Sequence, residues 1–387
     1  MNKASLLVAM VAVLSGCQTM GPEKANSGIR SLYSGDNSVL YQVQKQVDSP
    51  DQAMLNAGRA YQAGDLDQAL FQYLRAIELD PKRYEALVWV GRIHRDRGNT
   101  QLAEMAFTEV MDAAPDNIDA VMELGLLKLS VRQQQAAEEL LLKAVGMDQQ
   151  RLGATKNTAG LAVADIKVDS KSPVKLYNGL GVLADLRNDF PLSEAYYRLA
   201  LQIEPRSVLV QNSLGYSYYL AGQWPESERA YKRGISYEPS YKPIWRNYGL
   251  LLARMARYEE AISAFEQVEK RAEASNDVGY ICLVEGNLDM AEQFFRSAIE
   301  QSPAYYNAAW DNLNRVQQIR KLRELGGSAP VVEPVAAMPE SVPAAEPVAT
   351  ISAAVAELPD AAPIAAVPSA VEAGAAPAVV VNTATVP

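Results

Sequence analysis

VLVQNSLGYSYYLAGQWPESERAYKRGISYEP, residues 208–239, is the stretch of sequence that decides the fold. Leu214, Gly215 and Tyr218 lie on one face of a first helix, because Tyr218 follows Leu214 by four residues and Gly215 by three. A glycine then breaks this helix, and a second helix begins with Pro225 in its first turn. A further proline closes the stretch and stops the second helix. The pattern predicts a helix–turn–helix hairpin.

The same hairpin pattern recurs along the chain, mostly with a period of 34 residues. The small residue of the first helix returns at seven positions: Ala57, Gly91, Gly125, Gly181, Gly215, Gly249 and Gly279. One hairpin cannot bury its apolar face alone, so stacked neighbours must share a continuous core. The period and pattern resemble the tetratricopeptide repeat. This resemblance implies an all-α solenoid of about seven helix–turn–helix repeats with a capping helix.

Two steps between the small residues depart from the period. The step from Gly125 to Gly181 is 56 residues, which indicates an insertion at 150–173 between a first block of three repeats (50–149) and a second block of four (174–303). The insertion has no helical stripe, so it predicts a loop, with a short strand considered at 161–168. It is either a tolerated insertion or a hinge or contact loop. The shorter step from Gly249 to Gly279 predicts that the second helix of repeat six turns early, around 272–276.

The first 49 residues have the pattern of an exported, lipid-anchored protein. Residues 1–16 combine a positive charge with a short apolar run, which is typical of a signal peptide. The sequence LSGC ending at Cys17 resembles the bacterial lipobox, which implies cleavage before Cys17 and its acylation, palmitate included. Gln18 then implies the outer membrane, on its periplasmic side. The alternative is an ordinary secretory signal. Residues 17–49 are polar and predict a tether.

The composition argues against several functional classes. A net charge of −10 argues against nucleic-acid binding, which requires clustered Lys and Arg. His94 is the only histidine of the chain. His94 and Cys282 stand at the same position of their first helices as Tyr218 does in residues 208–239, so we interpret both as core residues. Without metal-ligand spacing, a phosphate loop or a nucleophile–base pair, we expect no metal, no cofactor and no catalysis.

A peptide-binding groove is the site that the repeat pattern favours. Four polar side chains share one register, three residues before the small residue of the first helix: Asn178, Asn212, Arg246 and Asn276. Amides both donate and accept, which suits an extended peptide backbone. Neighbouring positions add further candidate contacts: Tyr216, Tyr219, Asn247, Arg254 and Tyr280. The alternative is that several of these side chains merely link adjacent repeats.

The C-terminal part of the chain has two sections. Residues 304–325 predict a capping helix with a polar outer face, which a solenoid needs at its end. Residues 326–387 contain ten prolines and no Lys or Arg, so we expect a disordered Ala-, Pro- and Val-rich tail. The tail either extends to the cell wall or to a partner, or it serves as a solubilising spacer.

Residues 176–315 resemble the lipoproteins of tight-adherence (Flp-type) pilus assembly systems, the TadD family. The resemblance rests on NDVGY at 276–280 and SPAYYNAAWDNL at 302–313, together with the lipobox. It implies a pilotin-like scaffold at the outer membrane, with the pilus secretin and other assembly components as partners. The insertion and the long tail depart from the family pattern. The alternative function is an adaptor that docks enzymes of peptidoglycan synthesis or hydrolysis.

Overall fold

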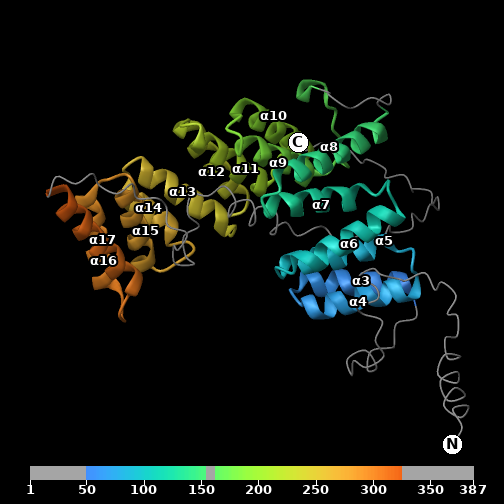
Figure 1. The fold of residues 1–387 in the computed structure, drawn as a ribbon, viewed down its shortest axis with the longest axis horizontal. Helices are drawn as coiled ribbons and strands as arrows, with labels where there is room; N and C mark the ends of the chain where they lie inside the picture. Colours follow the sequence, from blue (N-terminus) through green and yellow to red (C-terminus); the bar gives the residue numbers. More distant parts are fainter. Residues whose placement is uncertain (1–48, 154–161, 325–387) are drawn as a thin grey trace, which may run out of the picture.

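The structure is a computed structural model in which residues 49–153 and 162–324 are described (Figure 1). Cys17, the signal segment, nearly all of the tether and the tail from residue 325 lie outside these residues. The described part is helical throughout, with no strand, and consists of α3 (Pro50–Gln62), α4 (Leu66–Leu79), α5 (Tyr84–Asp96), α6 (Thr100–Ala113), α7 (Ile118–Ser130), α8 (Gln134–Arg151), the 3-10 turn η1 (Val163–Asp165), α9 (Val174–Asp185), α10 (Phe190–Ile203), α11 (Val208–Leu220), α12 (Trp224–Tyr237), α13 (Lys242–Arg254), α14 (Tyr258–Phe265), α15 (Arg271–Val284), α16 (Leu288–Gln301) and α17 (Asn307–Glu324).

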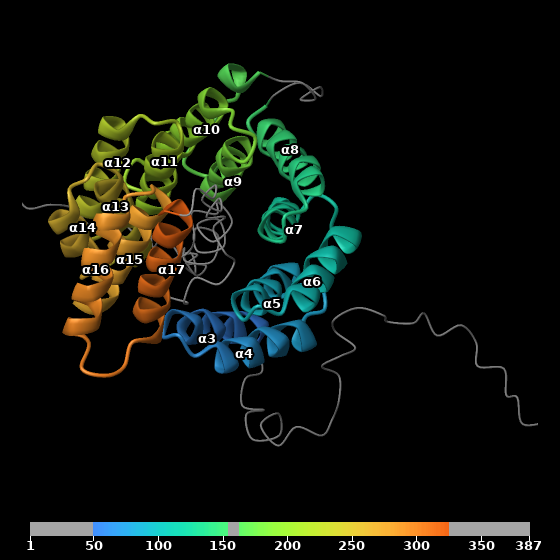
Figure 2. The ribbon, with the colours of Figure 1, turned by 60° about the vertical axis from the view of Figure 1, so that its left-hand side comes forward.

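The helices pair into hairpins that stack into a curved solenoid, which confirms the predicted fold class (Figures 1 and 2). We call α3–α8 the first block and α9–α16 the second block. The first helix of each hairpin also contacts the second helix of the preceding one. Buried side chains form three successive clusters along this stack, and α17 closes it by burying Leu313, Val316 and Ile319. Among the described helices, none has the length and apolarity needed to cross a membrane.

The small residue of the first helix is required by an aromatic ring of the second. A Cβ atom on Gly215 would lie 2.5 Å from the Tyr231 ring, and one on Gly181 would lie 2.5 Å from the Tyr197 ring. Both tyrosine rings are fully buried, so they have no free space into which to move. The recurring small residue and the recurring core therefore have the same cause, the close approach of two helices.

We expect Gly215→Ala to lower the free energy of unfolding by about 1–3 kcal/mol, because the added methyl group overpacks the Tyr231 contact. Chemical denaturation followed by circular dichroism measures this change. Arg233→Ala, at an exposed position of α12, is the control and should change the free energy by less than about 0.5 kcal/mol. Equal effects of the two substitutions would contradict the packing argument.

Two local predictions are wrong. The early turn of repeat six lies at residues 266–270 rather than at 272–276, which belong to α15. The second helix stops directly after Phe265, whose ring already packs on Gly249, and Glu273 accepts a hydrogen bond from the Lys270 backbone N–H (3.0 Å), which fixes the start of α15 there.

In the insertion, α8 continues to Arg151, and the part of 161–168 that the structure describes holds a 3-10 turn and extended backbone instead of a strand. This backbone bonds to a side chain, since the Gln149 amide donates to the Lys167 carbonyl (2.7 Å) and accepts from the Lys167 N–H (3.0 Å). No second strand is therefore needed to satisfy Lys167.

Candidate functional site

The first helices α3, α5, α7, α9, α11, α13 and α15 lie on the inside of the curve, and we call them the inner row (Figure 2). From α5 onward, each inner-row helix contacts the next helix of the row, and α17 continues the series by contacting α15. The second helix of each hairpin lies outside (Figure 2). A partner entering the curve therefore meets side chains of the inner row.

Three of the predicted site residues, Asn212, Asn247 and Asn276, take part in hydrogen bonds between neighbouring helices of the series that the row and α17 form. The Asn247 amide donates to Asn212 Oδ1 (2.9 Å), and the Asn312 amide donates to Asn276 Oδ1 (3.0 Å). Asn212 and Asn276 are buried, with 0% and 1% of their surface exposed. These bonds fix the orientation of both amides and join first helices one repeat apart.

The inner row of the second block also contains buried polar atoms that find no hydrogen-bond partner among the described residues. They include Asn178 Oδ1, Asn212 Nδ2, Tyr216 OH, Arg246 Nε and Tyr280 OH. A buried polar group left without a partner costs about 1–3 kcal/mol, and such groups are few in native structures. These atoms occur at two positions of the first helix, three residues before and one residue after its small residue, and because these positions are four residues apart they lie on the same face.

Tyrosine and arginine side chains add amphipathic contacts beside these amides. Tyr216 and Tyr219 stack with ring centroids 5.8 Å apart. Burial raises the pKa of Tyr219, and the neighbouring Arg254 guanidinium partly offsets this. Arg254 also pairs with Glu285 (3.1 Å). Burial likewise raises the pKa of Tyr280, and nearby Arg315, a residue that sequence reasoning missed, offsets part of it.

An acidic pair beside Arg246 was not predicted. The carboxyl groups of Glu269, in the turn before α15, and Asp277, on α15, lie next to each other, and both Glu269 oxygens and Asp277 Oδ2 are buried without a hydrogen-bond donor among the described residues. Burial raises the pKa of Asp277 well above its usual range, and the adjacent Glu269 raises it further. Burial also raises the pKa of Glu269 to about 7, although the Arg246 guanidinium acts in the opposite direction. Two adjacent buried carboxyls therefore share a proton at neutral pH.

The sequence held a signal for this pair. Asp277 directly follows Asn276, as Asn247 follows Arg246 and Ser213 follows Asn212, so all three share one register of the first helix. Asn247 at this register contacts the preceding first helix. The register therefore places Asp277 against Arg246 of the preceding repeat.

The first block contains a buried ionic cluster. Glu123 on α7 is 0% exposed; it accepts a hydrogen bond from Arg92 Nε (2.7 Å) and forms an ion pair with Arg95, both on α5. The Arg92 guanidinium also lies 4.6 Å from the centroid of the Trp89 ring. Burial alone would raise the pKa of Glu123, but Arg95 and Arg92 outweigh this and lower it to about 2. The cluster joins the first helices of repeats two and three.

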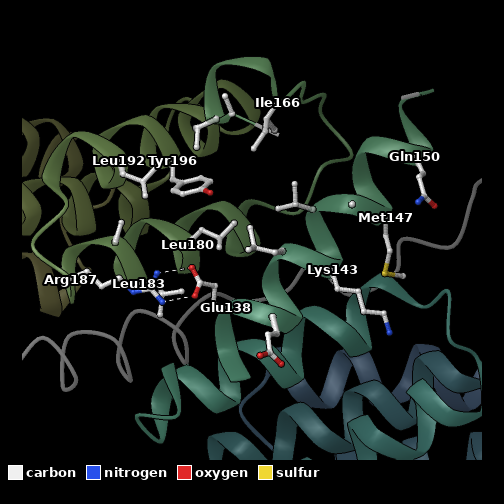
Figure 3. Close-up of a pocket in the computed structure, with 17 residues that line it drawn as sticks. Glu138, Lys143, Met147, Gln150, Ile166, Leu180, Leu183, Arg187, Leu192 and Tyr196 are labelled. Carbon is white, nitrogen blue, oxygen red and sulfur yellow. Dashed lines mark hydrogen bonds and ion pairs between the residues drawn. The ribbon is translucent and has the colours of Figure 1, made fainter. Parts of the chain in front are cut away.

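A pocket of about 840 Å³ lies where the two blocks meet, between α8, η1, α9 and α10 (Figure 3). Leu180, Leu183 and Tyr196 are among the apolar side chains that line it. At its rim, Nη1 and Nη2 of Arg187 donate to the two carboxylate oxygens of Glu138, each at 2.6 Å. The pocket therefore lies between the outer helices α8 and α10 of adjoining repeats and is bounded by α9 and η1.

The two residues with reactive side chains lie inside the solenoid. Burial lowers the pKa of His94, with a further contribution from Arg97. Burial raises the pKa of the Cys282 thiol to about 11, so this group is a poor nucleophile at neutral pH. Among the described residues, no cluster of His, Cys, Asp and Glu has the arrangement of a metal site.

Comparison with known families agrees with the repeat architecture. The family described as tetratricopeptide repeat matches residues 54–118, 212–273 and 249–306. Tetratricopeptide repeats therefore occupy residues 54–118 and 212–306 of this chain. Repeats of this family are typically non-catalytic scaffolds for protein interaction.

Among curated relatives, the PEX5-related protein of Mus musculus is 26% identical over 197 residues, which cover 51% of this tetratricopeptide-repeat chain and 33% of the relative. The cell division cycle protein 16 homolog of Homo sapiens is 24% identical over 158 residues, which cover 41% and 23%. The chain spans about a third of the length of the first relatives it matches.

Solved structures are similar at lower identity. A tetratricopeptide repeat protein from Parabacteroides merdae has a TM-score of 0.44 at 18% identity, covering 70% of this chain and 100% of that one. The pilF protein of Pseudomonas aeruginosa has a TM-score of 0.40 at 12% identity, covering 70% and 96%.

Proposed function

We propose that this protein is a scaffold whose inner row, in the second block, binds an extended segment of a partner protein. The unpartnered buried atoms on α9, α11, α13 and α15 carry this proposal, because they supply donors and acceptors on one face of the first helices, at two positions four residues apart that recur along the row. An extended peptide presents N–H and C=O groups that can satisfy them. Tyr219 and Tyr280 provide the aromatic contacts that dominate binding energy at many interfaces.

We expect the double substitution Tyr219→Ala and Tyr280→Ala to reduce partner capture at least about tenfold, because truncating a buried aromatic contact commonly costs about 2 kcal/mol in binding. Capture by the purified full-length variant, followed by quantitative mass spectrometry, measures this loss. Trp224→Ala is the matched control, since Trp224 is an exposed aromatic residue at the start of the outer helix α12. Normal capture by the double variant, with unchanged helicity, would exclude the inner row as the binding face.

We further propose that the scaffold serves assembly of a tight-adherence pilus or a related secretion machine. The resemblance of residues 176–315 to the lipoproteins of that system supports this. A crosslinking pull-down of the full-length protein from its native envelope tests it. Recovery of a secretin with pilus-assembly proteins would support the proposal, whereas recovery of peptidoglycan synthases or hydrolases would replace it with the adaptor function.

The proposal includes anchoring to the outer membrane through acylated Cys17, supported by the LSGC sequence that ends there. Several acyl chains on one residue give stable anchoring where one chain does not. We expect Cys17→Ala to release the protein into the soluble periplasmic fraction and to abolish labelling by a palmitate analogue. Cys282→Ala, at the buried thiol, should leave labelling unchanged. Membrane fractionation of Cys17→Ala without label would argue against the anchor.

A further inference from the structure

We infer that the C-terminal segment of this same chain, residues 325–387, docks on the inner row of the second block and competes there with the partner. This inference rests on the proposed function, because it assigns a second ligand to the same face. The docking would be intramolecular and would reduce partner binding until the partner displaces the segment. Three properties support it: the chemistry of the face, the chemistry of the segment and the distance between them.

The inner row of the second block offers apolar, cationic and hydrogen-bonding groups together. Tyr219 and Tyr280 are half-buried, so part of each ring stays accessible. Arg246 forms no ion pair with any described residue, and its buried Nε finds no hydrogen-bond partner among them. The acidic pair beside it, Glu269 and Asp277, shares a proton and so carries one negative charge rather than two. A ligand that suits this face combines small apolar side chains, free backbone groups and occasional carboxylates.

Residues 325–387 have this combination. They are dominated by Ala, Val and Pro, with ten prolines, and their charged side chains are all acidic: Glu333, Glu340, Glu346, Glu357, Asp360 and Glu372. Proline-rich chains favour the polyproline II conformation, in which the backbone makes no internal hydrogen bonds and remains available to a partner. Such chains dock on aromatic-lined grooves in many recognition domains. The carboxylates are complementary to Arg246.

The segment begins within reach of this face. It continues directly from α17, which ends at Glu324 and contacts α15 of the inner row. Packed helices lie about 8–10 Å apart, so the path from α17 back to α11 is roughly 30 Å. An extended proline-rich chain covers about 3.1 Å per residue, so about ten residues of the segment span this path. Attachment to the same chain gives an effective concentration of about millimolar, at which weak contacts suffice for docking.

Site-specific photocrosslinking in the full-length protein tests the inference. A photoreactive amino acid replaces Tyr219 or Tyr280 on the inner row, and Trp224 on an outer helix serves as the control position. We expect crosslinks from both inner positions to peptides of residues 325–387, at least about tenfold above the yield from position 224, because tethering serves all three positions alike and only docking favours the inner ones. Mixing isotopically heavy and light protein should show that both crosslinked ends come from one copy.

A charge variant sharpens the test. Changing all six acidic side chains of the segment to their amides should lower the crosslink yield and raise partner capture by about the same factor, because one event competes with the other. No crosslink to the segment, equal yields from position 224, or crosslinks between heavy and light copies would each overturn the inference. The proposed function fails separately, namely if the Tyr219 and Tyr280 variant captures the partner normally.

Discussion

Glu123→Gln should lower the free energy of unfolding by about 3–5 kcal/mol. Glutamine keeps the shape of the side chain but removes the negative charge between Arg92 and Arg95. The two guanidinium groups then repel each other with no counter-charge from Glu123, which is completely buried. Chemical denaturation of the purified protein measures the loss.

Glu226→Gln is the control for this prediction. Glu226 pairs with Arg229 on the surface of α12, where the two side chains are 38% and 65% exposed. Exposed pairs contribute about 0–1 kcal/mol. If Glu123→Gln destabilises no more than this control, the buried cluster does not join repeats two and three as the geometry indicates.

Asp277→Asn should stabilise the protein above pH 7, by about 2–3 kcal/mol, and should have little effect below pH 4. The pKa of Glu269 is raised to about 7 and that of Asp277 is raised as well, so the folded state holds a proton that the unfolded state has already lost above about pH 4.5. Stability is therefore full at low pH and falls as the pH rises through 7. Asparagine removes one carboxyl and with it the repulsion.

The groups that face the pair define the expected pH profile. Arg246 offsets part of the negative charge, while Glu273 adds to it near Glu269; Tyr306 lies close enough for its own pKa to be raised by all three carboxylates. Denaturation between pH 4 and 8 should show a falling stability for the natural sequence and a flatter profile for Asp277→Asn. Asp289→Asn, at an exposed position paired with Arg320, should leave the slope unchanged. Equal slopes for Asp277→Asn and the natural sequence would contradict the shared proton.

The sequence predicted what is repeated within each hairpin. Gly215 and Tyr231 recur as a pair because two helices of one hairpin must approach closely, and that requirement appears at a fixed spacing. The contacts between hairpins were harder to predict. Arg92 and Glu123 are 31 residues apart, which is close to one period but not equal to it. Which side chains meet across a junction depends on the rotation from one repeat to the next, and spacing alone does not specify this rotation.

The same reasoning applies at the inner row. The sequence placed Asn212 and Asn276 in one register, and in the structure each accepts a hydrogen bond from the next helix of the series, α13 and α17 respectively. The short step from Gly249 to Gly279 showed that repeat six lacks residues, but it did not show at which position. The position follows from Phe265, because its ring packs on Gly249 and the helix can end only after this contact is made.

The junction between the two blocks has a mechanical consequence. At the end of α8 the junction is pinned, because the Tyr177 hydroxyl donates to Asp148 (2.7 Å) inside the protein. On the outer side of the junction lies the pocket, and the exposed ion pair of Glu138 and Arg187 spans its rim. Bending that opens the outer rim strains this solvent-screened ion pair, whereas α7, α8, α9 and α10 share one buried apolar cluster across the junction, which resists any change in the core. The two blocks are therefore joined by a packed core on one side and an open rim on the other, and a load that bends the solenoid opens the rim before it disturbs the core.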